Sequence, residues 1–128
     1  MRDDEMWPVE SGTRAGGHYS PAFVAGDLIF VSGQLPVLPN GAHAPDAGFD
    51  VQAERAIANL LAAAAAAGAA PQQIVRVCVY IAGIGYWPNF DRIYARHFGS
   101  HRPARTVVPV PGLHYGYLVE IDAVAIRT

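Results

Sequence analysis

The order of hydrophobic patterns along this chain predicts an α+β fold, in which two helices pack on one face of a mostly antiparallel sheet. Segments that alternate apolar and polar residues lie before, between and after two segments with the 3.6-residue period of a helix. Turn-forming Gly and Pro residues separate these segments. The chain has 128 residues, which is enough for one domain with its own small core. The predicted order of elements is ββ-α-β-α-ββ.

The N-terminal third is predicted to hold an arm, two strands and a loop. Residues 1–16 are polar and aperiodic, so we expect a flexible arm there and a single domain at residues 17–128. Strands are expected at 19–24 and 28–32, joined by a turn at Ala25-Gly26-Asp27. Residues 36–48 contain three prolines and two glycines, which predicts a loop.

Two helices and three further strands are predicted in the remainder. Asp50 is a candidate N-cap for a helix that runs to about Ala67 and ends at Gly68. A strand is expected at 75–81, and a second helix begins near Pro88 and ends at Gly99. Strands at 106–110 and 117–126 complete the chain. The predicted buried stripes are Ile57, Leu60, Leu61 and Ala64 in the first helix, and Phe90, Ile93, Tyr94, His97 and Phe98 in the second.

Composition excludes several classes of function. The formal net charge is −2, which gives no overall attraction to nucleic acid or to anionic membranes. The chain has no lysine, so resident pyridoxal phosphate and lysine-imine chemistry are excluded. The single cysteine, Cys78, is expected to be a small core residue. With no signal peptide and no span of membrane length, we expect a cytoplasmic protein.

The predicted sheet has more apolar surface than two helices can cover. Apolar residues occupy neighbouring positions in the strands at 28–31, 77–79 and 118–125, so both faces of the sheet require burial. An uncovered apolar face is typical of a protein–protein interface. We therefore expect self-association, with a functional cleft between subunits.

Two charged residues stand inside the last apolar strands. Arg105 opens the run that ends at Val110, and Glu120 lies within the run 118–125. A charge among buried strand positions is rare unless it is paired or functional. A guanidinium can hold a planar carboxylate through two hydrogen bonds, and a glutamate can orient or deprotonate water. The pair indicates a site where water attacks a small anionic substrate.

Several motifs resemble the Rid/YjgF imine deaminase family over residues 17–127. They are Gly17-His-Tyr-Ser20, Gly26-Asp-Leu-Ile-Phe-Val-Ser-Gly-Gln34, Asn59, the Ala-Ala-Gly68 helix end, Tyr94 with Phe98, Pro103-Ala-Arg105 and Val119-Glu-Ile121. The resemblance implies a chorismate-mutase-like fold with a sheet of about six strands, and a homotrimer with clefts between subunits. It also implies hydrolysis of enamines and imines of the 2-aminoacrylate type to 2-keto acids and ammonia, without cofactor or metal.

The resemblance also implies the roles of individual residues. Arg105 would hold the substrate carboxylate, while Glu120 and the backbone carbonyl of Val107 would hold the attacking water. The same cleft would be lined by Tyr19, Ser32, Gly33 and Asp91, the last at a position where asparagine is common. The segments at 17–21 and 113–117 depart from the family's usual turns, which leaves the substrate side chain open.

Alternatives to these roles follow from the same residues. Arg105 could form a structural ion pair with Glu120 or Asp122, Tyr19 could only pack its ring, and Ser32 could cap a turn. A non-catalytic small-ligand-binding protein would keep the same cleft. A weaker alternative is RNA cleavage on a basic patch, although we expect no nucleic-acid partner. His97 and His101 have a zinc-like spacing, but no cysteine or acidic partner is close by in the sequence. The patch comprises Arg92, Arg96, His101, Arg102 and Arg105.

Overall fold

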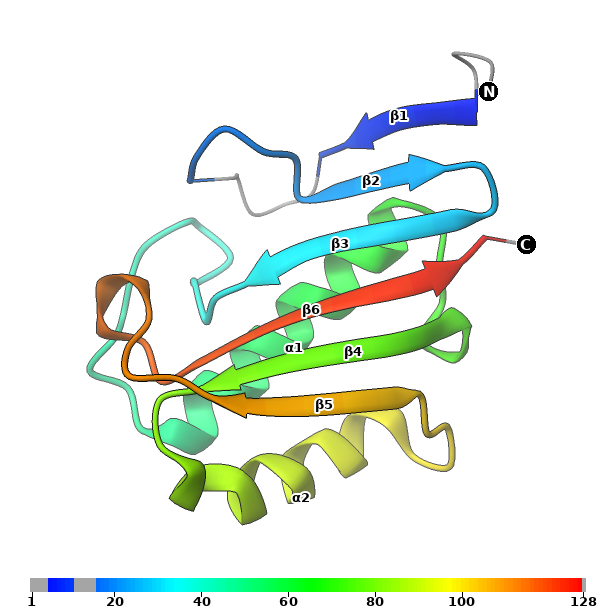
Figure 1. Cartoon of the computed structure of the whole chain (residues 1–128). Coiled ribbons are helices and arrows are strands. Elements are labelled where there is room, and N and C mark those ends of the chain that lie inside the picture. The colour runs from blue at the N-terminus through cyan, green and yellow to red at the C-terminus, as the bar shows by residue number, and fades with distance from the viewer. Residues whose placement is uncertain (1–4, 11–15, 128) are drawn as a thin grey trace.

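The computed structural model describes residues 5–10 and 16–127, and they form a sheet with two helices on one face (Figure 1). The predicted fold class is therefore confirmed. The strands are β1 Met6–Val9, β2 Ala22–Ala25, β3 Leu28–Gln34, β4 Ile74–Ile81, β5 Ala104–Pro109 and β6 Val119–Ile126, and the helices are α1 Phe49–Ala66 and α2 Trp87–Phe98. Short 3₁₀ turns lie at Pro71–Gln73, Ile84–Tyr86 and His114–Gly116.

The sheet has the strand order β1-β2-β3-β6-β4-β5. Its pairs are antiparallel except β4 and β5, which run parallel because α2 crosses over between them. The β2–β3 hairpin turns at Gly26 and Asp27, as predicted, and Gly26 has a φ of 60° that favours glycine. One outer edge of the sheet is β1, and the other is β5.

The N-terminal segment corrects the prediction of a flexible arm. Met6–Val9 form β1, which pairs with Ala22–Ala25 of β2. Four residues are too few to show a strand period, and their partner lies more than ten residues away along the chain. Pro8, which cannot donate a backbone hydrogen bond, suits an edge strand. Residues 1–4 and 11–15 of the predicted arm lie outside the described part of the chain.

The core fills the space between the sheet and the two helices. Most of the α1 stripe is buried as predicted, although Leu61 is only half-buried. Small alanines on the same face let α1 pack closely on β3 and β6. Gly48, rather than Asp50, is the N-cap of α1, and Asp50 instead accepts hydrogen bonds from Asn89 and Arg92 of α2. Neither helix, within the described residues, combines the length and apolar character needed to cross a bilayer.

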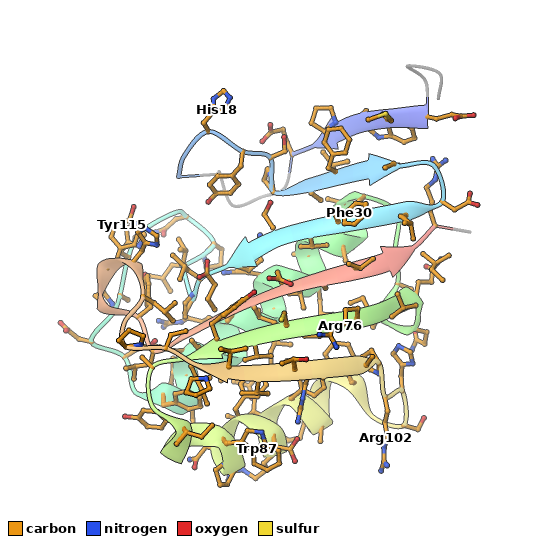
Figure 2. All side chains as sticks on the ribbon, viewed as in Figure 1. His18, Phe30, Arg76, Trp87, Arg102 and Tyr115 are labelled. Carbon is orange, nitrogen blue, oxygen red and sulfur yellow. The ribbon has the colours of Figure 1, made fainter. Side chains whose placement is uncertain are left out.

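No helix among residues 5–10 and 16–127 covers the other face of the sheet. Figure 2 shows Phe30 and Arg76 on this open face, turned away from α1. Large apolar side chains there are exposed, which confirms the predicted uncovered apolar face: Phe23, Leu28, Phe30 and Ile126 are 36% to 44% exposed. Cys78 also lies on this face and is half-buried, so the prediction that it is a core residue was wrong. Its neighbours Val77 and Val79 take the core positions, because side chains alternate along a strand.

Candidate functional site

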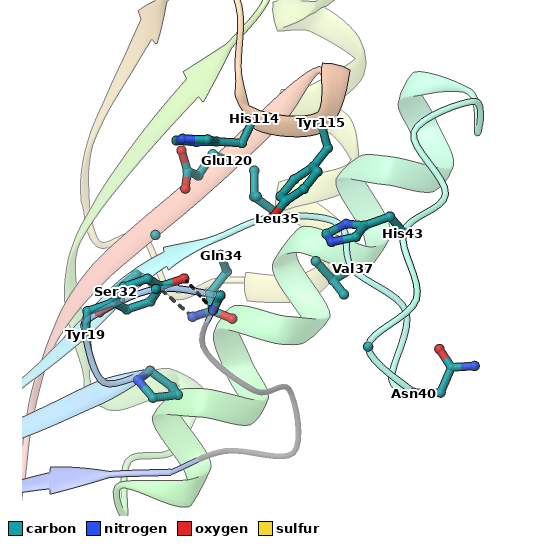
Figure 3. Close-up of a pocket in the computed structure, with 15 residues that line it drawn as sticks. Tyr19, Ser32, Gln34, Leu35, Val37, Asn40, His43, His114, Tyr115 and Glu120 are labelled. Carbon is teal, nitrogen blue, oxygen red and sulfur yellow. Dashed lines mark hydrogen bonds between the residues drawn. The ribbon is translucent and has the colours of Figure 1, made fainter.

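A cavity of about 750 Å³ opens beside Glu120 at the end of the open sheet face (Figure 3). Glu120 reaches it from β6, while Ser32 and Gly33 reach it from the end of β3. Tyr19 contributes from the loop that precedes β2. Four of the residues predicted for the site are thus brought together within one chain.

Gly33 allows the Glu120 carboxylate to approach the backbone of β3. A Cβ atom added at Gly33 would lie 2.7 Å from Oε2 of Glu120 and 3.1 Å from its Cδ. Real Cβ atoms essentially never show a contact below 3.0 Å, so any side chain at this position would displace the carboxylate. The glycine is needed here for space and not for a left-handed backbone, since its φ is not positive.

The environment of Glu120 makes its carboxylate a candidate base. Burial raises the pKa of this group, the positive charge of His114 lowers it, and the negative charge of Asp122 raises it. Asp122 lies on the same face, as predicted, and accepts a hydrogen bond from the Tyr80 hydroxyl at 3.1 Å. No hydrogen bond among the described residues involves the Glu120 carboxylate, which leaves its oxygens available to water or to a ligand.

Ser32 and Tyr19, the other predicted residues of this cavity, each make a hydrogen bond that holds the 17–21 loop. The Ser32 hydroxyl donates to the Ser20 carbonyl at 2.6 Å, so it holds the 17–21 loop against β3, as the turn-cap alternative requires. The Tyr19 hydroxyl accepts from the Gly16 amide at 3.3 Å, but 53% of Tyr19 remains exposed at the cavity. Ser32 therefore positions the loop, and Tyr19 offers a free aromatic surface.

The far wall of the cavity belongs to the long loop between β3 and α1, and side chains of α1 hold it. Asn59 donates to the carbonyls of Leu35 and Val37, both at 2.9 Å. Buried Gln52 donates to the carbonyls of Pro45 and Ala47 and accepts from the Leu118 amide at 2.8 Å. These bonds give a loop without regular secondary structure a fixed shape.

Arg105 lies in a second cavity, of about 520 Å³, between β5 and the C-terminal half of α2. Its Nη2 donates to Oδ1 of Asp91 at 2.9 Å, and its guanidinium lies 4.7 Å from the centre of the Tyr94 ring. Arg105 therefore forms its ion pair with Asp91. Glu120 and Asp122, the two partners that the sequence suggested, do not pair with it. Asp91 uses one of the five N–H donors of the guanidinium, so the others remain available.

Tyr94 adds an unusual polar group to the Arg105 cavity. The ring is 7% exposed, and its hydroxyl is buried without a hydrogen-bond partner among the described residues. Burial raises the pKa of Tyr94 to about 12, although the charge of Arg105 opposes this. An unpaired buried hydroxyl costs about 1–3 kcal/mol, so Tyr94 keeps an unfavourable group beneath the Arg105 cavity.

Arg105 and Glu120 do not meet within one chain. Arg105 pairs with Val77 of β4 and lies on the helix-covered face, whereas Glu120 pairs with Tyr80 and lies on the open face. Val107 follows Arg105 on the edge strand β5, where the Val110 amide bonds to the Ile81 carbonyl. By alternation, the Val107 carbonyl faces away from β4 toward the free edge, next to Arg105 and not next to Glu120.

Among the residues of the Glu120 cavity that sequence reasoning missed are three with ring side chains: His43, His114 and Tyr115. The bulky segment at 113–117 was recognised as unusual, but its side chains were given no role. His43 lies in the Pro- and Gly-rich loop, where no periodicity indicates which side chains turn inward. Only the folded loop brings it to Tyr115.

Two arginines of the predicted basic patch that lie outside the two cavities have acidic partners. Arg92 and Arg96 of α2 pair with Asp50 and Glu54 of α1 at 3.2 and 2.8 Å. His97 also bonds to Glu54, whereas the ring of His101 bonds to the Ile74 carbonyl. The two histidines therefore have separate partners, and the predicted basic patch is partly neutralised.

The chain is similar to proteins of known family. Residues 10–127 match the family model described as Endoribonuclease L-PSP. The human 2-iminobutanoate/2-iminopropanoate deaminase is 32% identical over 111 residues, which are 87% of this chain and 81% of the human protein. The crystal structure of the Escherichia coli YjgF gene product has a TM-score of 0.89 and 29% identity, and covers 95% of this chain and 99% of its own. Escherichia coli TdcF with bound serine has a TM-score of 0.90 and 29% identity, with the same coverage.

Proposed function

The chain belongs to the Rid/YjgF family, whose model is described as Endoribonuclease L-PSP, and on that premise we propose that it hydrolyses 2-imino acids to 2-keto acids and ammonia. The observation that carries the proposal is the half-buried Glu120 carboxylate, which faces an open cavity without a hydrogen-bond partner among the described residues. A carboxylate of this kind can hold and deprotonate a single water.

The proposed reaction needs little beyond positioning. The imine carbon is already electrophilic, so water can add to it while Glu120 accepts a proton from the water. A C–O bond forms, the π electrons of the C=N bond move to nitrogen, and nitrogen takes up a proton. Nitrogen then takes up a second proton from Glu120, the hydroxyl group gives its own proton back to Glu120, and the oxygen lone pair forms the C=O bond as the C–N bond breaks, which gives the 2-keto acid and ammonia. Fixing the substrate beside the water supplies most of the acceleration.

Arg105 would hold the substrate carboxylate through the N–H donors that Asp91 does not use. The structure of Escherichia coli TdcF with bound serine supports a ligand that carries a carboxylate beside a nitrogen atom. Together, these observations favour Arg105 as the residue that orients the substrate.

The proposed site requires two copies of the chain. From strand spacings of about 4.8 Å and a rise of about 3.3 Å per residue, the Cα atoms of Arg105 and Glu120 are roughly 14 Å apart across two strands. Their side chains also leave opposite faces of the sheet. A second copy packed on the exposed apolar face could bring its β5 edge, with Arg105 and the Val107 carbonyl, to the Glu120 cavity. A homotrimer would close three such clefts.

The experiment that tests the proposal measures imine decay. An amino-acid oxidase generates 2-iminopropanoate from alanine, and semicarbazide competes with the protein for the imine. Wild-type protein should suppress semicarbazone formation. The rate of imine hydrolysis calculated from this suppression should be at least tenfold lower for Arg105→Ala, since a charge-assisted contact contributes roughly 1.5–3 kcal/mol. Arg92→Ala is the matched control, because Arg92 pairs with Asp50 on the exposed helical surface.

Two results would contradict the proposal. Arg105→Ala could be as active as wild type, or wild-type protein could leave imine decay unchanged. If wild-type protein binds pyruvate in calorimetry but does not accelerate imine decay, the chain is a ligand-binding protein. RNA cleavage has less support, because Arg92 and Arg96 are paired with acidic residues.

A further inference from the structure

The Glu120 cavity is much larger than a three-carbon imine requires. Its volume is about 750 Å³, within the range of about 300–1,000 Å³ that holds drug-sized ligands. The end beside Glu120 would be occupied by the reacting carbon, its water and the β5 edge of the second copy. The remaining space extends between the β3–α1 loop and the 113–117 segment, and its lining determines which substrate side chain fits.

That extension has an aromatic wall. The rings of His43 and Tyr115 are stacked, with centroids 3.8 Å apart and planes 25° from parallel. Figure 3 shows the Tyr115 ring with His43 on one side and with Leu35 and Glu120 on the other. Tyr115 is 57% exposed, so a large ring surface remains free to contact a ligand.

The His43 ring of this wall is held by a hydrogen bond, and the backbone of Tyr115 is strained. The Tyr117 hydroxyl accepts a hydrogen bond from the Ala44 amide at 3.1 Å and lies 2.9 Å from Nδ1 of His43. It can donate its proton to this nitrogen, which holds the imidazole ring. Tyr115 has a φ of 63°, a left-handed conformation that costs a non-glycine residue roughly 1–3 kcal/mol. Strain of this kind persists where the surroundings hold a side chain in a required position.

The rest of the lining favours an uncharged, planar side chain. Leu35 and Val37 add apolar surface beside the aromatic wall, and Tyr19 adds a second exposed ring. No arginine is found among the described residues that line this cavity, so no guanidinium there would hold a second carboxylate. Asn40, at the outer end, offers only a neutral amide.

We propose that the substrates of this site are 2-imino acids with an aromatic side chain, which would stack on the wall formed by His43 and Tyr115. The inference rests on the proposed function, because it assumes that the reacting carbon lies beside Glu120. Contact between aromatic rings contributes enough to favour such a substrate by about tenfold over a methyl side chain.

Ligand binding tests the inference without relying on catalysis. Phenylpyruvate and pyruvate, the keto acids from the two kinds of imine, are titrated into the wild-type oligomer by calorimetry. Phenylpyruvate should bind about tenfold more tightly. Tyr115→Gly, which suits a φ of 63°, should remove most of that preference and leave pyruvate affinity within threefold. His43→Ala should act in the same direction, and His18→Ala, an exposed residue of the 17–21 loop, should change neither affinity.

Hydrolysis of imines made from phenylalanine and alanine provides the second measurement. The ratio of kcat/KM should favour the aromatic imine in wild type and fall about tenfold in Tyr115→Gly. Equal affinities for the two keto acids, or an equal change in both for Tyr115→Gly, would overturn the inference. If aromatic preference in binding is found but neither imine is hydrolysed, the proposed function fails while the aromatic subsite stands.

Discussion

Substitution of Gly33 by alanine tests whether the position of the Glu120 carboxylate determines activity. The added Cβ atom would lie 2.7 Å from Oε2, whereas ordinary contacts begin at 3.4 Å. The carboxylate must therefore retreat by about 0.7 Å, and a displacement of about 1 Å in an active site can reduce the rate on the order of 100-fold. We expect kcat for imine hydrolysis to fall between about 10- and 100-fold in Gly33→Ala.

The same substitution should have little effect on stability. The clash is with the end of a side chain that can rotate away, and alanine favours a strand by about 0.5–1 kcal/mol over glycine. The Tm should therefore remain within about 4 °C of wild type. Gly112→Ala is the matched control, because a Cβ atom there meets no atom within 4 Å and its φ is not positive. A Gly33→Ala protein with wild-type kcat would refute the role given to the carboxylate position.

Four further predictions concern charge and assembly. Asp91→Asn should lower the Kd for pyruvate several-fold in calorimetry, because it removes the negative charge that competes for Arg105; an unchanged or higher Kd would contradict this. In the pH–rate profile, the midpoint of the acid limb should lie above pH 4.5, since burial raises the pKa of Glu120, which must be deprotonated to act as a base. His114→Ala removes a positive charge that lowers this pKa, so it should move the acid side to still higher pH; a shift to lower pH would be inconsistent with the electrostatics. Phe30→Asp, on the open face, should reduce the oligomer to monomers in light scattering and abolish hydrolysis, while an intact oligomer would exclude this face as the interface.

Local patterns in the sequence were enough to predict most of the fold. The period of α1, Pro88 at the start of α2 and the turn at Gly26 all depend on neighbours in the chain, and all are confirmed. The strand β1 was missed, because its only partner is β2 and four residues carry no period. Cys78 was misplaced because both faces of β4 carry apolar residues, so alternation alone did not identify the core face.

The candidate site was predicted in part. Glu120, Ser32, Gly33 and Tyr19 line one cavity, as motif resemblance implied. The partner of Arg105 could not be read from the sequence, since Asp91 reaches it only through the packing of α2 on β5. The aromatic wall depends on two segments that are far apart in the chain, and only their contact in the fold reveals it.

The most direct test of the central claim is to mix two inactive variants. Arg105→Ala and Glu120→Gln chains are each assayed alone, then unfolded together at equal concentration, refolded and assayed again for imine hydrolysis. If each cleft takes Arg105 from one copy and Glu120 from another, about one quarter of the clefts in a random mixture are intact. The account therefore predicts recovery of roughly a quarter of wild-type activity. A mixture that refolds to the wild-type oligomer but remains as inactive as the separate variants would contradict it.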